Sequence, residues 1–234
     1  MRRTSENVVG PLDLVSEDSW PPDFTTAGVI EVLEPLVAEA RSMRLRSVID
    51  ARLASVTVVM DAPHDPHNGA AVMRSCDAFG IQELHVVPRD EPFAISTTVT
   101  RGSEKWVDVI EHSSAAAAVR ALRERGFELV RTHPRGDLVP EELARIPRCA
   151  LVVGNEHDGI REELEAAATR SVRIPMRGFT ESLNLGVSAG ILLAATTAGR
   201  PGDLAPDVRK RLYARGLFQT VPRAAAVLAA SRAR

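Results

Sequence analysis

The stretch VVMDAPHDPHNGAAVMRSCDAFG, from Val58 to Gly80, contains two structural patterns joined by a turn. Its first residues are apolar and β-branched, which predicts a buried strand. The residues after the turn have the apolar spacing of a helix, and a glycine follows the last of them, as is typical of a helix end. The stretch therefore predicts a strand, a turn and a helix, which is the building unit of a parallel α/β sheet.

The same alternation continues along the chain. Further apolar or β-branched runs predict strands, and alanine-rich or leucine-rich runs between them predict helices. The predicted strands are 56–61, 83–87, 127–133, 149–156 and 171–176, and the predicted helices after the opening stretch are 113–126, 161–170 and 183–199. We therefore predict an α/β fold with a parallel sheet flanked by helices.

Helical spacing also occurs outside this alternating region. Apolar residues between Thr25 and Leu53 have it, and Pro35 predicts a break between two helices there. The segment DVRKRLYARGLF, residues 207–218, predicts a basic helix near the C-terminus. These patterns divide the chain into an N-terminal extension with basic helices (1–54), an α/β domain (55–200) and a C-terminal basic helical extension (201–234).

The composition is that of an ordinary globular protein. The 234 residues are 44% hydrophobic with a formal net charge of −2, and no apolar run approaches the roughly 20 residues of a membrane span. Two cysteines cannot form a disulfide framework, and the N-terminus shows no apolar signal segment, so we expect a cytoplasmic protein that does not bind a membrane. Because the net charge is close to neutral, any nucleic-acid site must come from local basic clusters.

Four side chains that could bind a metal or transfer a proton crowd the turn of the opening stretch: Asp61, His64, Asp65 and His67. A metal site is disfavoured, because the histidines lie in a proline-containing turn and no later Cys/His cluster completes a tetrahedral set. The simpler interpretation is that Asn68 caps the following helix. Arg74 then lies one turn into that helix, where the helix dipole does not favour a cation. We expect it to be exposed, paired, or directed at an anionic ligand.

Two further turns follow predicted strands and are rich in glycine and polar residues. One is GNEHDGI, residues 154–160, and the other lies within GFTESLNLGVSAG, residues 178–190. Ligands of open α/β sheets bind at the carboxyl ends of strands. Glu156, Ser182 and Asn184 are each either a structural cap or a functional group. Three such turns together favour one shared ligand pocket over three separate caps.

Three stretches resemble, in the same order, the signature motifs of the SPOUT RNA ribose methyltransferases of the TrmH type: PHNGAAVMRSCDAFG, LVVGNEHDGI and IPMRGFTESLNLGVSAGILL. The segment GSEKWVDV resembles the family's sequence between the first two motifs. The resemblance covers about residues 43–200. It implies a deep C-terminal trefoil knot in the α/β domain, a homodimer, and S-adenosylmethionine as the methyl donor. It implies no requirement for a metal.

Carried over by position, the resemblance assigns roles to residues of all three motifs. The implied catalytic residues are Asn68, Arg74, Glu156, Ser182 and Asn184. The implied cofactor contacts are Thr132, Gly154, Ile174 and Leu183. RNA binding is expected from the basic residues Arg41, Arg44, Arg46, Arg200, Arg209, Lys210 and Arg211. For the C-terminal helix, a merely solvated face is the alternative interpretation.

The implied reaction is methyl transfer to a ribose 2′-hydroxyl of RNA. The hydroxyl must lose its proton, and the family's proposed base is the arginine that corresponds to Arg74. Because arginine is effectively always protonated in proteins, two routes stay open. Either Arg74 loses a proton in a site that disfavours its charge, or it stays cationic, binds phosphate and stabilises the developing alkoxide.

Basic helices at both ends favour tRNA as the substrate, with guanosine 18 of the D-loop as the target. Ribosomal RNA is the alternative substrate. After the third motif the chain keeps only Arg200 of the basic run usual in the tRNA enzymes, so its tRNA-docking surface is expected to differ. A catalytically silent RNA-binding relative is the alternative of another class. It would lack Arg74, or Ser182 and Asn184, and all three are present.

Overall fold

The computed structural model describes residues 8–9, 20–89, 93–155 and 158–232. The chain divides into two compact units. The first contains Met1–Leu14 and Ala54–Arg200, and the second contains Val15–Leu53 and Pro201–Arg234. We call the first the sheet unit and the second the helical unit.

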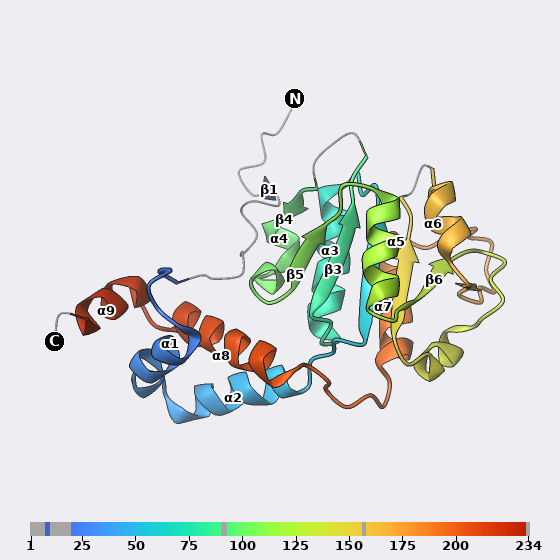
Figure 1. Ribbon diagram of the computed structural model, residues 1–234. Helices are drawn as coiled ribbons and strands as arrows, with labels where there is room; N and C mark the ends of the chain where they lie inside the picture. The colour runs from blue at the N-terminus through green and yellow to red at the C-terminus, as the bar shows by residue number, and fades with distance from the viewer. Residues whose placement is uncertain (1–7, 10–19, 90–92, 156–157, 233–234) are drawn as a thin grey trace. The chain divides into compact units, whose positions relative to one another are not determined.

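Six parallel strands form the main sheet of the sheet unit (Figure 1). They are β2 (Val56–Asp61), β3 (Glu83–Val87), β5 (Asp108–Glu111), β6 (Glu128–Thr132), β7 (Cys149–Val153) and β8 (Arg170–Val172). Their spatial order is β5-β3-β2-β7-β6-β8, and every neighbouring pair is parallel. The central strands β2 and β7 are buried along their whole length. Their sequences are largely apolar or β-branched, which fits this burial on both faces.

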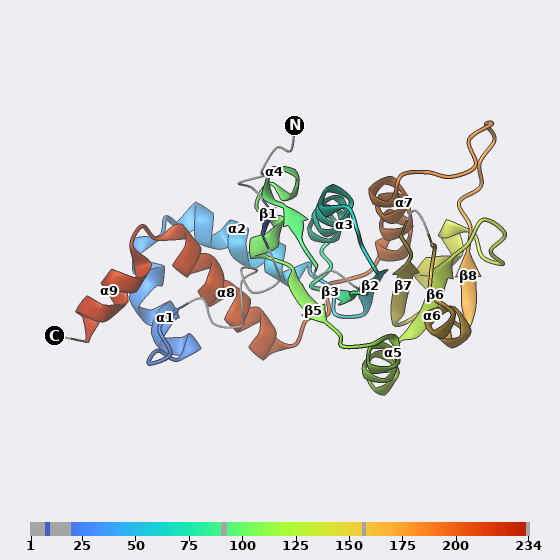
Figure 2. The ribbon, with the colours of Figure 1, turned by 90° about the horizontal axis from the view of Figure 1, so that it is seen from above.

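Helices cover both faces of this sheet (Figure 2). On one face α3 (Pro66–Ala78) and α7 (Leu185–Thr197) lie side by side, and on the other lie α5 (Ala115–Glu124) and α6 (Glu162–Ala167). The predicted α/β class, a parallel sheet flanked by helices, is confirmed. The shorter elements are β1 (Val8–Val9), β4 (Ile95–Ser96), α4 (Thr97–Thr100), η3 (Ser103–Lys105) and η4 (Pro140–Arg145), and β1 pairs with β4 in an antiparallel ladder.

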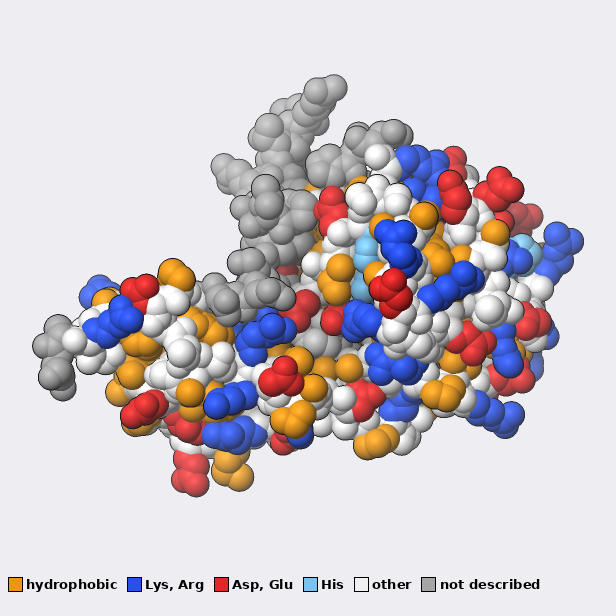
Figure 3. Space-filling model, viewed as in Figure 1, with side chains coloured by type: hydrophobic (Ala, Val, Ile, Leu, Met, Phe, Trp, Pro, Cys, Tyr) orange, Lys and Arg blue, Asp and Glu red, His pale blue; other side chains and the backbone are white. Residues whose placement is uncertain are grey.

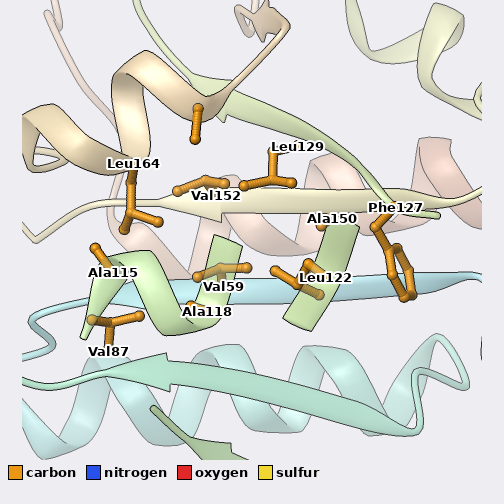
Figure 4. Close-up of a cluster of buried hydrophobic side chains, with 11 residues drawn as sticks. Val59, Val87, Ala115, Ala118, Leu122, Phe127, Leu129, Ala150, Val152 and Leu164 are labelled. Atoms are coloured by element: carbon orange, nitrogen blue, oxygen red, sulfur yellow. The ribbon is translucent and has the colours of Figure 1, made fainter. Parts of the chain in front are cut away.

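The core beneath α5 and α6 is made of side chains from the central strands and these two helices (Figure 4). Val59 and Val152 of the strands pack with Leu122 of α5 and Leu164 of α6, and all four are fully buried. Burial of one such side chain contributes about 1.5–3 kcal/mol to folding. The cluster therefore holds in place the strands whose carboxyl ends carry the motif turns.

The helical unit combines helices from both ends of the chain. Its elements are α1 (Thr26–Leu33), η2 (Glu34–Leu36), α2 (Glu39–Asp50), α8 (Pro206–Thr220) and α9 (Ala224–Ser231). Helices α1 and α2 pack against α8, and α1 also packs against α9. Pro35 lies in η2, between α1 and α2, so the predicted break is confirmed. The two extensions that appear separate in the sequence thus form one packed unit.

Helix α8 is the predicted basic helix, but it is more buried than its charge indicates. Residues 212–217 are all buried, including Tyr213 and Arg215, which is 1% exposed. A merely solvated helix is therefore not what the structure shows. Within the described ranges, no helix combines the length and the apolar character needed to cross a membrane.

Candidate active site

A pocket of about 470 Å³ lies where β6, β7 and β8 end. Its lining includes all four predicted cofactor contacts, which are Thr132, Gly154, Ile174 and Leu183. Ser182, one of the predicted catalytic residues, lines it as well. Small-molecule sites have volumes of about 300–1,000 Å³ and favour the carboxyl ends of parallel strands. The pocket therefore has the size and the place expected for a ligand site.

The sequence analysis missed other residues of this pocket wall. They are apolar side chains next to the predicted residues and two carboxylates: Pro134, Val153, Met176, Leu185, Leu192, Glu165 and Glu181. Their position beside the motif glycines and strand ends was the only signal in the sequence that could have found them. A wall that is largely apolar and also carries carboxylates suits a ligand with an apolar ring system and a positive charge.

The turn after β7 forms one side of the pocket and requires glycine at its start. A Cβ added to Gly154 would lie 2.3 Å from the carbonyl carbon of Gly159, so no side chain fits. Asn155 and Gly159 exchange two backbone hydrogen bonds of 3.2 Å each, and Asn155 Oδ1 accepts one from the Asp158 amide at 2.6 Å. The turn is thus tightly closed. Glu156, the catalytic residue predicted for this segment, lies outside the described residues.

Helix α3 begins earlier than the sequence analysis proposed. Its N-cap is Asp65, whose carboxylate accepts a hydrogen bond from the His67 amide at 2.8 Å, and Pro66 occupies the first helical position. The prediction that Asn68 caps this helix is wrong, because Asp65 followed by proline is the stronger start signal. Asn68 instead lies in the first turn of α3, where its side chain can face another element.

The charged residues of the opening turn have separate structural partners. Asp61 is buried at the end of β2 and forms an ion pair with Arg161. Asp65 caps α3 and also lies 3.2 Å from Nδ1 of His67. Among the described residues, no three His, Cys, Asp or Glu side chains are grouped as metal ligands.

The first and third motifs meet through two asparagine side chains. Asn184 Nδ2 donates a hydrogen bond to Asn68 Oδ1 at 2.8 Å. Asn184 is also the N-cap of α7, and its Oδ1 accepts from the amides of Gly186 at 2.9 Å and Val187 at 3.4 Å. The amide of Asn184 is therefore fixed through both its oxygen and its nitrogen. Residues 182 and 183, directly before it, line the pocket.

Small residues allow α3 and α7 to approach each other closely. A Cβ added to Gly186 would lie 2.6 Å from Cβ of Ala71, and one added to Gly190 would lie 3.7 Å from Oγ of Ser75. Helices approach as closely as the side chains at their contact allow. This close packing keeps Asn184 within hydrogen-bonding distance of Asn68.

Arg74 is exposed on α3 and makes no hydrogen bond or ion pair with any residue that the structure describes. It is also absent from the residues that line the pocket. Within one chain, the structure thus brings Asn68, Ser182 and Asn184 together beside the pocket but does not bring Arg74 into it. The guanidinium has the exposure expected for a group that binds an external ligand.

Arg200 is engaged inside the sheet unit, contrary to its predicted role in RNA binding. Its guanidinium donates to the carbonyl oxygens of Thr196 at 2.7 Å and Pro147 at 2.9 Å. It also donates to the carbonyl oxygens of Ala144 at 3.3 Å and of Ile146. These bonds join the C-terminal end of α7 to the segment at the end of η4. Because its donors are used within the protein, we leave Arg200 out of the RNA surface.

Arg46 has structural partners within the helical unit. Its Nη2 donates to Glu34 Oε1 at 2.5 Å, and its guanidinium carbon lies 3.9 Å from the ring centre of Tyr213. The Tyr213 hydroxyl donates to the same carboxylate at 2.7 Å. Hydrogen bonds from Tyr213 and Arg46 lower the pKa of Glu34. This network joins α2, η2 and α8, a role that the sequence analysis did not foresee.

The other basic residues predicted to bind RNA differ in exposure. Arg41, Arg44 and Lys210 are exposed, whereas Arg211 is half-buried and Arg209 pairs with Asp50 at 3.3 Å. On the face of the helical unit seen in Figure 3, Lys and Arg side chains are interspersed with Asp and Glu. The role of these residues in RNA binding stays a prediction, and the exposed residues are its strongest members.

Known proteins are similar to this chain in both sequence and fold. Residues 55–194 match the family model described as the SpoU rRNA Methylase family, and this range includes all three motifs. A tRNA (guanosine(18)-2′-O)-methyltransferase from Thermus thermophilus is 36% identical over 156 residues, which are 66% of this chain and 80% of that relative.

Two solved structures extend this similarity to the fold. The Aquifex aeolicus TrmH/SpoU tRNA modifying enzyme matches with a TM-score of 0.68 and 28% identity, over 79% of this chain and 98% of that chain. The AdoMet-bound rRNA methyltransferase from Sinorhizobium meliloti matches with a TM-score of 0.55 and 29% identity, over 65% of this chain and 59% of that chain. The resemblance carried by the three motifs is therefore confirmed, and the chain belongs to the SpoU methylase family.

Proposed function

We propose that this protein transfers a methyl group from S-adenosylmethionine to the ribose 2′-hydroxyl of guanosine 18 in tRNA. The observation that carries the proposal is the hydrogen bond between Asn68 and Asn184 at 2.8 Å. It joins the helix that presents Arg74 to the loop that lines the pocket. The bond links residues of the first and third motifs that are 116 positions apart in the sequence, which supports one shared site.

The pocket residues fit S-adenosylmethionine. Gly154 lines the pocket, and Ile174 and Leu183 supply apolar surface for an adenine ring. Glu181 supplies negative charge for the cationic end of the molecule, whereas Glu165 lies in the same wall but pairs with Arg131 at 2.8 Å. When bound, S-adenosylmethionine supplies a methyl group that is already activated by its sulfonium. The protein then has to orient the two reactants, which is a large contribution to catalysis.

Arg74 is the residue that we assign to the ribose hydroxyl. The hydroxyl is a poor nucleophile until its proton leaves. Arg74 either loses its own proton beforehand and accepts the hydroxyl proton as a neutral guanidine, or it stays cationic, binds a phosphate and stabilises the alkoxide. Replacement by lysine separates the two routes, because a cationic clamp tolerates lysine with a small residual rate. Asn68 and Asn184 would hold the ribose and the pocket loop in fixed positions relative to each other. Ser182 and Glu156 would position the loops around them.

Transfer RNA is favoured over ribosomal RNA by the extent of the structural matches. The tRNA modifying enzyme covers 79% of this chain, which is more than the sheet unit contains, so its match includes part of the helical unit. The rRNA methyltransferase covers 65%. We therefore propose that the helical unit contributes to tRNA binding through Arg41, Arg44 and Lys210. We expect the reaction to take place in the cytoplasm, where tRNA is available.

We also propose a homodimer formed through α7. Val187 and Ile191 are 51% and 39% exposed, and Leu183, just before the start of α7, is 37% exposed. Val187 and Ile191 are four residues apart and share one face of the helix, so they form an apolar stripe. Val187→Glu should convert the dimer to a monomer in light scattering after size-exclusion chromatography. Met43→Glu is the matched control, because Met43 is 64% exposed but lies in the helical unit. A wild-type monomer would contradict the proposal.

A dimer explains why Arg74 does not line the pocket of its own chain. The stripe lies on α7, and α7 packs directly on the helix that carries Arg74. We propose that each pocket is completed by Arg74 of the partner subunit. Mixing Arg74→Ala with Gly154→Val protomers tests this, since only a shared site would restore activity in mixed dimers. Two variants that stay inactive after verified subunit exchange would place Arg74 in its own subunit's site.

We further propose that the sheet unit contains the C-terminal trefoil knot implied by its family. The segment after β6 pairs with β8, since the Leu138 amide donates to the Ser171 carbonyl at 2.8 Å and Leu138 accepts from the Arg173 amide at 3.0 Å. Helix α7, which follows β8, packs against η4 and β7. A crystal structure in which residues 173–184 pass outside the loop at 133–139 would contradict a knot.

Methyl transfer from labelled S-adenosylmethionine to unmodified tRNA transcripts tests the proposed function. We expect incorporation with the wild type and none with Arg74→Ala, and digestion with mass spectrometry should place the label on the ribose of guanosine 18. A transcript with deoxyguanosine at that position is the matched control and should accept no label. Labelling of ribosomal RNA alone would replace the proposed substrate by the alternative one. Labelling of neither RNA would favour a silent RNA-binding relative.

A further inference from the structure

A buried ion pair lies beneath the cofactor pocket and belongs to none of the three motifs' assigned residues. Asp61 ends β2, and its side chain is fully buried. Its carboxylate accepts from the Arg161 amide at 2.6 Å and from Arg161 Nε at 2.6 Å, and Nη2 of the same guanidinium lies 2.5 Å from Oδ1. One arginine thus binds both oxygens of this carboxylate with its backbone and its side chain.

The guanidinium also reaches a second strand end. Arg161 Nη2 donates to the carbonyl oxygens of Val87, the last residue of β3, at 3.2 Å and of Pro88 at 3.4 Å. Arg161 itself is the N-cap residue of α6. A single side chain therefore ties the start of α6 to the carboxyl ends of β2 and β3, which are neighbours in the sheet.

The ion pair of Asp61 and Arg161 connects the pocket wall to the segment before α3. Gly159 and Ile160, directly before Arg161, line the pocket. Asp61 lies four residues before Asp65, the cap of the helix that carries Asn68 and Arg74. Displacement of Arg161 would therefore move the pocket wall, while displacement of Asp61 would move the start of α3. A second ion pair, between Arg89 and Asp158 at 2.9 Å, joins the same turn to the segment after β3.

We propose that Arg161 is a positioning residue for S-adenosylmethionine, which it serves by fixing the turn at 154–160 to the end of β2. The inference rests on the proposed function for the identity of the ligand. Physical reasoning favours positioning over stability as its main effect. A buried ion pair contributes little net stability, because the cost of desolvating both charges offsets their attraction. What it does supply is one defined geometry, through a planar fork that lysine and glutamine cannot reproduce.

The test separates positioning from folding by removing one charge or both. Arg161→Gln leaves the Asp61 carboxylate buried without its cation, whereas Asp61→Asn with Arg161→Gln removes both charges. Arg125→Gln is the matched control, because Arg125 pairs with Glu83 at 2.6 Å in the same unit and lines no part of the pocket. For each variant, titration calorimetry with S-adenosylmethionine gives Kd, thermal melting gives Tm, and initial rates give KM for tRNA.

We expect Arg161→Gln to lower Tm and to raise Kd for S-adenosylmethionine roughly tenfold, since displacements of about 1 Å in a site have effects of this order or larger. The double variant should regain Tm but keep the raised Kd, and Arg161→Gln, in which Asp61 is unchanged, should keep the wild-type KM for tRNA. The control should keep the wild-type Kd. Recovery of both Tm and Kd in the double variant, or an unchanged Kd in Arg161→Gln, would overturn the proposal. A wild type that binds no S-adenosylmethionine would instead overturn the proposed function, and this inference with it.

Discussion

Helix α3 of the sheet unit and helix α2 of the helical unit use arginine in opposite ways. Arg74 on α3 is exposed and has no partner among the described residues, whereas Arg46 on α2 is bound to Glu34 and lies over Tyr213. An arginine with partners stabilises the fold, and one without them contributes no such energy but can bind an anion. A basic residue can therefore be judged as a candidate for RNA contact only after its partners within the protein have been identified.

The largest effect is expected from replacing Arg74, an arginine without a partner among the described residues. Arg74→Ala should lower kcat by about 10²–10⁴-fold, which is the range for loss of a proton-transfer group. Its Tm should stay at the wild-type value, because the side chain has no partner among the described residues. Methyl transfer under saturating tRNA and thermal melting are the two measurements. A large drop in Tm would mean that Arg74 is a structural residue like Arg46, and the contrast between the two helices would disappear.

Replacement of Arg200, whose guanidinium is hydrogen-bonded within the sheet unit, should lower stability and leave tRNA binding unchanged. Arg200→Ala leaves the carbonyl groups of Thr196 and Pro147 without their donor, so the free energy of unfolding should fall by about 2–3 kcal/mol. Chemical denaturation measures this change. Binding of tRNA to the folded variant should keep its wild-type salt dependence. A lower salt slope would show that Arg200 contacts phosphate after all.

A smaller loss of stability is expected in the helical unit. Arg46→Ala removes the ion pair with Glu34 and the contact with the Tyr213 ring, but both charged side chains are more than a third exposed. Surface pairs of this kind contribute at most about 1 kcal/mol. Denaturation of the variant beside Arg44→Ala, an exposed arginine of the same helix, measures the difference. Equal stabilities would show that the network is not a structural element.

The smallest effect is the pH dependence of the same network. The pKa of Glu34 is lowered from its ordinary value of 4.5 by hydrogen bonds from Tyr213 and Arg46. The unfolded state therefore binds a proton more readily, and the stability from Glu34 is present above pH 4.5 and lost as the pH falls through the folded-state pKa. Wild type should be more stable than Glu34→Gln at neutral pH, and the difference should vanish in acid. A difference that is constant with pH would contradict this linkage.

The sequence predicted the sheet well where strands are buried on both faces. The run at 56–61 is apolar or β-branched up to Asp61 and forms β2 with the predicted bounds. Strand β5 was not predicted, because it is half-exposed at the edge of the sheet and its four residues carry no strong pattern. The start of α3 was misplaced because Asn68 was weighed as a cap and Asp65 with Pro66 was not.

The candidate site was predictable in part. Motif positions identified five residues that line one pocket, because the carboxyl ends of parallel strands lie at one edge of a sheet, whereas Asn68, Arg74 and Asn184 do not line it. The pair of Asp61 and Arg161 was not predictable, since the two residues are 100 positions apart and neither belongs to a local pattern. The partners of Arg46 and Arg200 were hidden for the same reason. Local sequence indicates where a charge is, and only tertiary structure shows what neutralises it.

The absent side chain at Gly186 sets the width of the site. With Ala71 directly opposite, α3 and α7 already touch as closely as two backbones with one methyl group between them can. Any larger residue at position 186 would push the helices apart and lengthen the distance between the two asparagine amides. We therefore expect a substitution at Gly186, only two residues from Asn184, to weaken the contact between the two asparagines while leaving every predicted catalytic residue in place.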